Sequence, residues 1–559
     1  MDRDGDNLSL STIVEVPRRS CSKPANNHDD ALQAQTYRAG ASVATALEHQ
    51  LTFKDAVRLY PKAIAFSLVF STAIIMEGYD MALIGSFYGY ESFRNKYGNQ
   101  PNPDGGMVIS ADWQTYIQVG GMCGQIFGLY LNGWVSDAIG YKRTMILAQV
   151  VMIAFIFIPF FASNIQTILA GQILMGIPWG VFQTLTLAYA SDIAPVILRP
   201  YLTAYVNLCW VIGQLLSAGV LRGLLNLQNE WAYRVPFALQ WVWPPFIILG
   251  TLFAPESPWW LVRMGRHSDA KQAILKLVSP KPDVSFDADA QVSLIHETNE
   301  LEKATSAGTN YWHCFMRADL RRTEIASITY IAQAMCGSVL MGYSVQFYER
   351  AGLSSSNAFN LNIVQYSVGA IGVILSWFLM SKFGRRTLYI AGTTSLFLIL
   401  LVVGGLGFAP QSNSGPSWAV GSLLILYTFV YDLSVGPVCY TIVAEIPSTR
   451  LKAKTIVLAR NFNNMAGLVN NTLMPRMLGI HAWNWGAKTG LFWAAFCFLI
   501  MVWAYFRLPE PKDRTFGELD VLFEHKVSAR NFAKARVDQF GDRTGAVKVE
   551  ERTDVSMYY

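Results

Sequence analysis

The sequence carries little charge for its length. Only 15% of its 559 residues are Asp, Glu, Lys or Arg, whereas 52% are hydrophobic. Soluble globular domains contain about 25% charged residues, so this composition excludes that class and indicates an integral membrane protein. The net charge of +5 is small, and the basic residues occur in short loops. We therefore expect no nucleic acid among its partners, and the lipid bilayer as its surroundings.

Cysteine pairs and catalytic motifs are also missing from the sequence. The seven cysteines are scattered, mostly within apolar runs and without a CxxC pair, so we interpret them as packing residues. The sequence has no metal-ligand cluster, nucleophile elbow or phosphate-binding loop, and we expect neither an enzyme nor a metal site. Residues 1–58 are polar, without an apolar run behind a basic start, and predict a disordered cytoplasmic tail rather than a cleavable signal peptide.

Long apolar windows dominate the remaining chain. A window of about 20 apolar residues is long enough to cross a bilayer. Six windows lie near 62–87, 113–133, 144–162, 166–189, 202–221 and 234–253, and six more near 323–346, 359–380, 387–408, 418–442, 455–475 and 488–507. The sequence therefore predicts an all-α integral membrane protein with twelve transmembrane helices. Basic residues cluster after every second window, which predicts that those loops and both termini are cytoplasmic.

Three sequence landmarks occur in the same order in each half of the chain. They are GWVSDAIGYKR at 133–143 with SKFGRR at 381–386, SDIAPVILR at 191–199 with AEIPSTR at 444–450, and PES at 255–257 with PE at 509–510. This repetition predicts two pseudo-symmetric six-helix bundles, at 59–254 and 321–508. A cytoplasmic helical linker at 255–320 would join them, and a cytoplasmic tail would occupy 509–559. Two such halves rocking about a central site suit alternating access.

Two carboxylates, Glu77 and Asp80, lie inside the first apolar window. A carboxylate at mid-membrane costs about 2.5–3.5 kcal/mol on insertion scales, so it usually has a partner, a proton or a substrate. Three residues apart on a helix, the two acids are expected to share a face and to raise each other's proton affinity. The alternative is that both lie near the helix end, in contact with headgroup water.

The landmarks resemble those of the major facilitator superfamily, and PESPWWLVRMGR at 255–266 resembles its sugar porter family. Seven further segments are similar to fungal alpha-glucoside permeases of the maltose permease type: EGYD at 77, MGIPWGVFQ at 175, YLTAYVNLCWVIGQ at 201, FALQWVWP at 237, YERAGL at 348, YDLSVGPVCY at 431 and RTFGELDVLFE at 514. The resemblance implies the major facilitator fold and proton-coupled uptake of alpha-linked di- or trisaccharides across the plasma membrane, driven by the proton gradient without a cofactor. An uncoupled sugar facilitator and a transporter-like sugar receptor remain open as alternatives.

The resemblance implies proton coupling at Asp80, because hexose symporters of the family use an aspartate there together with an arginine in helix 4. In this chain that arginine position falls on Gln172, so the usual counter-charge is missing. Arg460, inside LARNFNN, is the best remaining cation at membrane depth. We therefore predict a coupling group of Glu77, Asp80 and Arg460. Alternatively, Arg460 reaches the cytoplasmic headgroups.

A sugar site needs neutral donors and acceptors and an aromatic face. Helical spacing places Gln172, Trp179 and Gln183 on one face, and Asn207 and Gln214 on another. Matches to sugar porter motifs add residues in helices 7 and 10. The predicted sugar-binding residues are Gln172, Trp179, Gln183, Asn207, Gln214, Gln333, Gly337, Gln365, Asp432, Tyr440 and Asn464. Any one of the amides could instead form an interhelical hydrogen bond.

The resemblance also implies a network of intracellular ion pairs that forms in the outward-open state and breaks when the inner gate opens. Its predicted members are Asp137, Arg143, Asp192, Arg199, Glu256, Arg386, Glu445 and Arg450. The alternative is that these are solvated loop charges that anchor the topology.

Overall fold

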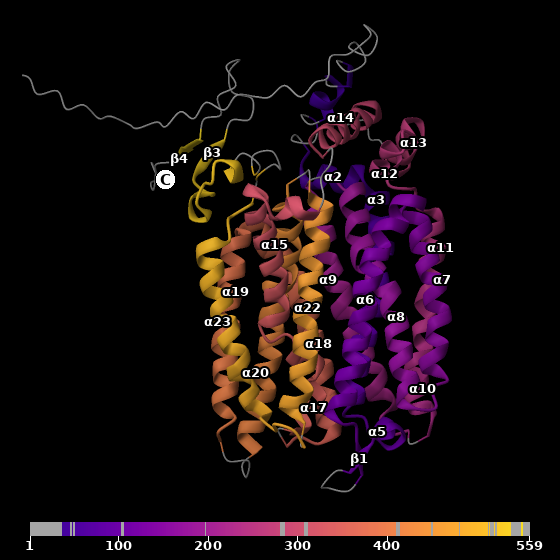
Figure 1. Cartoon of the computed structure of the whole chain (residues 1–559), viewed down its shortest axis with the longest axis vertical. Coiled ribbons are helices and arrows are strands. Elements are labelled where there is room, and N and C mark those ends of the chain that lie inside the picture. Colours follow the sequence, from indigo (N-terminus) through magenta and orange to yellow (C-terminus); the bar gives the residue numbers. More distant parts are fainter. Residues whose placement is uncertain are drawn as a thin grey trace, which may run out of the picture.

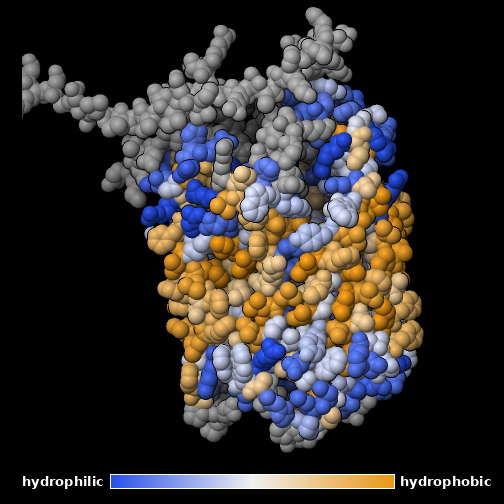
Figure 2. Space-filling model, in the orientation of Figure 1, coloured by the Kyte–Doolittle hydropathy of each residue, from blue (hydrophilic) through white to orange (hydrophobic). Residues whose placement is uncertain are grey.

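Long helices run side by side in one bundle in the computed structural model (Figure 1). It describes residues 36–37, 39–44, 47, 51–101, 106–195, 197–227, 229–279, 286–306, 311–350, 352–409, 414–448, 451–479, 481–512, 514, 519, 522–537 and 549–551. We call the end that carries helix α14 the α14 end, and the opposite end, with strand β1, the β1 end. Hydrophobic side chains form a band around the middle of the visible face, between more polar ends, as expected for a bilayer-spanning protein (Figure 2).

The first half of the bundle contains six membrane-length segments, two of which are divided into shorter helices. Its elements are α3 (Pro61–Ser71), α4 (Ala73–Phe87), α6 (Ala111–Ile139), α7 (Tyr141–Phe160), α8 (Ile165–Ile193), α9 (Arg199–Leu224), α10 (Trp231–Ala238), η1 (Leu239–Val242) and α11 (Trp243–Phe253). Between α4 and α6, at the β1 end, lie α5 (Glu91–Tyr97) and a hairpin of β1 (Gln100–Pro101) and β2 (Met107–Val108).

The second half repeats this plan. Its elements are α15 (Arg317–Met335), α16 (Val339–Gly342), α17 (Ser344–Arg350), α18 (Ser355–Lys382), α19 (Arg385–Leu406), α20 (Ser414–Leu433), α21 (Val435–Glu445), α22 (Lys452–Leu478), η3 (Gly486–Lys488) and α23 (Thr489–Arg507). Gly337 has φ +99°, in the left-handed region that favours glycine, and lies where the chain turns from α15 into α16. Interrupted helices of this kind are common in transporters, where they line cavities.

Ten segments among the described residues are long and apolar enough to cross a membrane. The two further long helices, α6 and α22, have 29 and 27 residues. They are long enough but less apolar than the other ten, because glutamines interrupt α6, and Arg460 and several asparagines interrupt α22. These two helices contact each other between the halves. Together the segments correspond to the twelve predicted windows.

The segment between the halves contains helices and lies at the α14 end (Figure 1). It contains α12 (Pro258–Arg263), α13 (His267–Leu277), α14 (Ala288–Ser306) and η2 (Tyr311–Phe315). Helix α2 (Phe53–Leu59) begins inside the segment expected to be a disordered tail, because Thr52 caps it by accepting from the Asp55 N–H. In the carboxy-terminal segment η4 (Ala529–Asn531) precedes a hairpin of β3 (Ala535–Val537) and β4 (Val549–Glu551). The two hairpins are an exception to the all-α prediction, and both lie outside the bundle.

Candidate functional site between the halves

A hydrogen-bonded chain of three side chains joins the two halves within the bundle. Gln183 of α8 donates through Nε2 to Glu77 Oε1 of α4, and accepts through Oε1 from Arg460 Nε of α22 at 2.8 Å. The carboxylate requires a donor and the guanidinium an acceptor, so this network fixes the orientation of the Gln183 amide. Glu77 is fully buried, and Arg460 is 7% exposed. The predicted partnership of Glu77 with Arg460 therefore occurs through Gln183, which was expected to bind sugar.

Aromatic rings surround the Arg460 guanidinium. It lies 5.5 Å from the centroid of the Tyr330 ring, a distance typical of a cation–π contact. Tyr440 packs edge-on against Tyr330 and is also a hydrogen-bond partner of Arg460. Arg460 is thus held inside the bundle by α15, α21 and α8, which disfavours the alternative that it reaches the headgroups.

Asp80 has a different set of partners from Glu77. Gln240 of η1 donates to Asp80 Oδ1 at 2.6 Å, and Gln172 of α8 lies beside the same carboxylate. Asp80 has no ion pair among the described residues. Side chains three residues apart on a helix diverge by about 60° around its axis. Helix α4 therefore directs its two acids to different neighbours, not to one shared partner as expected.

A third buried carboxylate, Asp432 at the end of α20, makes another contact between the halves. Asn207 of α9 donates to Asp432 Oδ1 at 3.2 Å. Gly369 and Gly436 leave room for this pair, because a Cβ at Gly369 would lie 2.6 Å from Asp432 Oδ2 and one at Gly436 3.2 Å from Asn207 Nδ2. The sequence predicted both residues as sugar ligands, and the structure shows that they contact each other.

Several other predicted sugar ligands have partners within their own half. Gln333 donates to the Gly436 carbonyl at 3.2 Å, and Gln365 accepts from the Tyr348 hydroxyl at 2.6 Å. Gly337 faces Leu400 and Trp493, on the side of α15 away from the first half. Gln214 is only partly buried.

Among the buried donors without a hydrogen-bond partner in the described part of the chain are four on α6, α8 and α22. Gln172 and Trp179 of α8 lie close together, both within 4 Å of the position that a Cβ at Gly121 would take. The four unpaired donors are Gln125 Nε2, Gln172 Nε2, Trp179 Nε1 and Asn464 Nδ2. Buried polar groups without partners are uncommon in native proteins and often mark a place where a ligand or water binds. Helices α8 and α22 also carry Gln183 and Arg460.

The predicted intracellular charges lie at the α14 end, where they organise each half internally. Glu256 accepts from the Tyr141 N–H at 2.9 Å and the Lys142 N–H at 3.2 Å, at the start of α7. Burial raises the pKa of the Glu256 carboxyl above its usual range. Asp192 accepts from the Ser257 hydroxyl at 2.6 Å. Of the other members in this half, Asp137 lies near Arg263, Arg143 is exposed, and Arg199 donates to the Ala194 carbonyl at 3.3 Å.

In the second half, as in the first, a glutamate side chain accepts from backbone N–H groups at the start of a helix. Glu510 accepts from the backbone N–H groups of Arg385 and Arg386 at 2.8 and 3.1 Å, at the start of α19. The side chain that pairs with Glu445 is that of Arg385, at 3.2 Å. Arg386 instead donates to the Tyr505 carbonyl at 2.8 Å. Arg450 lies outside the described residues.

At the β1 end the two halves meet closely. A Cβ on Gly85 of α4 would lie only 2.2 Å from the Gly342 carbonyl oxygen of α16. Nearby, the rings of Tyr88 and Tyr343 stack with their centroids 6.0 Å apart. We call this contact the β1-end gate, and it is closed in this structure.

Sequence reasoning missed three functional candidates, namely Gln240, Tyr330 and Arg385. Gln240 offered a signal, because it is an amide within an otherwise apolar window. Arg385 offered one too, because it belongs to the SKFGRR landmark at 381–386. Tyr330 offered none, since it resembles an ordinary helix residue until its partners are known. Among the described residues, no group of three or more His, Cys, Asp or Glu side chains could hold a metal ion.

Comparisons with known proteins match this arrangement. The family model described as "Sugar (and other) transporter" matches residues 66–523. The alpha-glucosides permease MPH3 of Saccharomyces cerevisiae is 42% identical over 524 residues, covering 92% of this chain and 85% of that protein. The maltose permease MAL31 of the same species is 41% identical over 546 residues, covering 96% and 87%.

Among solved structures, the fold resembles the major facilitator proton:xylose symporter XylE bound to 6-bromo-6-deoxy-D-glucose, with a TM-score of 0.70, 20% identity and coverage of 83% of this chain and 99% of XylE. XylE from E. coli in a partially occluded inward open conformation gives a TM-score of 0.66 at 19% identity, covering 81% and 100%. This likeness confirms the predicted fold of twelve helices in two bundles. The chain has the fold of the major facilitator superfamily and belongs to the sugar transporter family.

Proposed function

We propose that this protein imports alpha-glucosides across the plasma membrane by proton symport, through alternating access of the site between its halves. The curated relatives are named as permeases for alpha-glucosides and maltose, and they match over most of the chain. In this proposal the α14 end is cytoplasmic, as the basic loops there predict, and the β1 end faces outward.

The observation that carries the proton-coupling proposal is the Glu77–Gln183–Arg460 chain. When Glu77 is ionised, Gln183 donates to it and presents its oxygen to Arg460, which holds α4, α8 and α22 together. A proton on Glu77 converts one carboxylate oxygen from an acceptor into a donor. Gln183 would then turn its amide so that its oxygen faces Glu77, and Arg460 would lose its acceptor. Protonation on one half is thereby coupled to the contact between the halves.

Charge counting supports proton binding in this region. Glu77, Asp80 and Asp432 are buried carboxylates, whereas Arg460 is the one buried guanidinium near them in the described structure. Isolated buried charges are strongly unfavourable, so the group cannot hold all three carboxylates ionised without further compensation. We propose Glu77 and Asp80 as the proton-binding pair, with Arg460 as the partner that responds to the protonation state of Glu77.

The sugar would bind next to this chain. Its hydroxyl oxygens would accept from the four unpaired donors of Gln125, Gln172, Trp179 and Asn464. A second group of ligands, Asn207 and Asp432, would become available if their mutual hydrogen bond breaks as the halves move. Neutral amides and an indole suit an uncharged, hydroxyl-rich ligand better than an ionic one.

Uptake of labelled maltose by transporter-deficient yeast, with simultaneous recording of external pH, tests this function. Accumulation with alkalinisation of the medium is expected. Glu77→Gln is expected to abolish accumulation but to retain maltose exchange across the membrane. Glu324→Gln is the matched control, because Glu324 is an acid of α15 that pairs with Arg507 inside its own half.

The outcomes separate the alternatives. Entry only to equilibrium in the unmodified protein would support the uncoupled facilitator. Absence of entry, with the protein shown at the cell surface, would contradict alpha-glucoside transport. Unchanged accumulation in Glu77→Gln would remove Glu77 from the coupling mechanism.

A further inference from the structure

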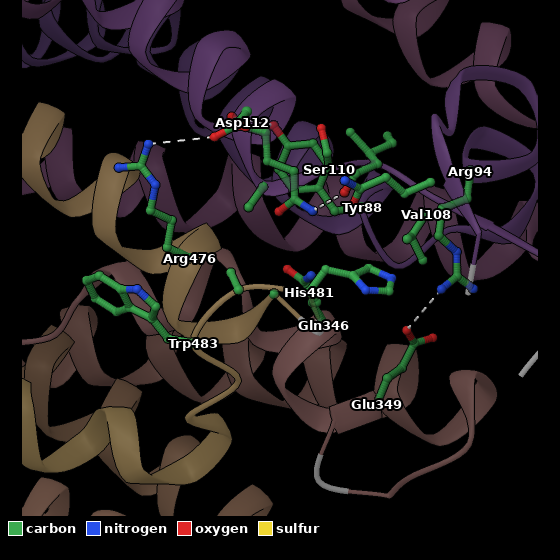
Figure 3. A pocket seen from close by; sticks show the side chains of 16 residues that line it. Tyr88, Arg94, Val108, Ser110, Asp112, Gln346, Glu349, Arg476, His481 and Trp483 are labelled. Atoms are coloured by element: carbon green, nitrogen blue, oxygen red, sulfur yellow. Dashed lines mark hydrogen bonds and ion pairs between the residues drawn. The ribbon is translucent and has the colours of Figure 1, made fainter. Parts of the chain in front are cut away.

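A cavity of about 280 Å³ lies between the halves at the β1 end, outside the β1-end gate. Figure 3 shows its lining, with the first half contributing Tyr88 and Ser110 and the second half contributing Gln346, His481 and Trp483. Ligand sites for drug-sized molecules have about 300–1,000 Å³, so this volume suits a single sugar ring better than a disaccharide. The cavity is separate from the Gln183–Arg460 region, because the Tyr88–Tyr343 stack and the Gly85–Gly342 contact close the bundle beside it.

Two buried amide oxygens in this lining have no hydrogen-bond partner in the described structure. They are Gln114 Oε1 of α6 and Gln346 Oε1 of α17, and the two residues are only 4% and 6% exposed. Gln114 is oriented by its own Nε2, which donates to the Ile109 carbonyl at 2.9 Å. Leaving a buried acceptor unpaired costs free energy, so each oxygen favours a ligand that brings a hydroxyl donor. One acceptor comes from each half, and such a ligand would bridge them.

The charges around the cavity cancel each other. Arg94 pairs with Glu349 at 3.9 Å, and Arg476 pairs with Asp112 at 3.6 Å. Figure 3 shows these two pairs on opposite sides of the cavity, each joining the halves. A charged ligand would have to compete with an existing ion pair, whereas a neutral ligand leaves both intact. Tyr88 and Trp483 add aromatic surface of the kind that packs on the apolar face of a sugar ring.

We propose that this cavity is a second sugar-binding subsite, which holds one glucosyl ring of the substrate outside the closed gate through Gln114 and Gln346. The proposal rests on the proposed function for the identity of the sugar. A ring held there would lie next to the Tyr88–Tyr343 stack, ready to enter when the gate opens. The protein would then bind two maltose molecules per chain, one in this cavity and one near Gln183.

Equilibrium binding of labelled maltose to the purified full chain tests the proposal by counting sites per chain. Two sites are expected. Gln346→Leu is expected to weaken one of them about 2- to 10-fold, the usual effect of losing one neutral hydrogen bond, and to leave the other unchanged. Gln149→Leu is the matched control, since Gln149 of α7 is a buried glutamine whose oxygen is also unpaired in the described structure but does not line the cavity.

Trp483→Ala provides a second variant, because Trp483 is 47% exposed and its removal leaves the buried packing intact. It is also expected to weaken only one site. A single maltose site in the unmodified protein, or two sites that Gln346→Leu and Trp483→Ala both leave unchanged, would overturn the subsite while leaving alpha-glucoside transport standing. Absence of any maltose binding or uptake would overturn both.

Discussion

The glycine contact at the β1-end gate allows a sharp test of alternating access. In Gly85→Ala the new Cβ would lie 2.2 Å from the Gly342 carbonyl oxygen, whereas ordinary contacts begin at 3.4 Å. The two backbones would have to separate by more than 1 Å. Overpacking of this kind costs about 1–3 kcal/mol. Because α4 and α16 belong to different halves, that cost falls on the conformation in which the gate is closed.

A penalty of this size corresponds to about a 5- to 150-fold shift of the equilibrium away from the closed gate. We expect maltose uptake by Gly85→Ala to fall by a similar factor in the yeast assay. Binding of maltose to the purified protein should persist, since the open gate still gives access to the site. Uptake at the unmodified rate, with normal surface expression, would refute the assignment of this contact as a gate.

Two other glycines provide controls for this prediction. Gly342→Ala should leave uptake nearly unchanged, because a Cβ there meets no atom within 4 Å in the described structure. Gly213→Ala should behave differently again. Its Cβ would lie 2.2 Å from the Ile75 carbonyl oxygen in the same half, so the clash exists in every conformation and should lower the thermal stability of the protein.

Three further variants test other contacts. Gln240→Leu removes the donor to buried Asp80 and should lower the unfolding free energy by about 1–3 kcal/mol, measured by thermal denaturation in detergent. Gly337→Ala forces a Cβ into a backbone with φ +99° and should cost about 1–2 kcal/mol in the same assay. Arg94→Glu breaks the partly exposed pair with Glu349, which is worth about 1 kcal/mol or less. Uptake should therefore change less than about fivefold, and adding Glu349→Arg should restore it.

The sequence predicted the fold well, because a helix needs about 20 mostly apolar residues to cross a bilayer, and hydropathy windows detect such segments. Twelve windows correspond to twelve membrane-length segments. The windows could not locate the helix breaks at Thr72 and Ser434, because local polarity barely changes there. They also gave no indication of the two short hairpins, whose strands have only two or three residues.

The candidate site was predicted less completely. Arg460 could be singled out because a cation within a predicted membrane window is rare. The intermediate position of Gln183 could not be predicted, because a glutamine looks the same whether it binds a sugar, a carboxylate or a guanidinium. Likewise, the partner of Asp80 depends on how η1 packs against α4. Spacing along one helix carries no information about that contact.

The polar character of α6 and α22 has a consequence for how the protein is made. A translocon sorts helices by their own hydrophobicity as they emerge, and these two are less apolar than the other ten segments. Each should therefore enter the bilayer with help from a neighbour, α6 from α8 and α22 from α15, with which they pack extensively. The interface between the two halves would be complete only after α22 is synthesised. Polarity suited to sugar and proton binding thus makes membrane insertion itself depend on correct folding.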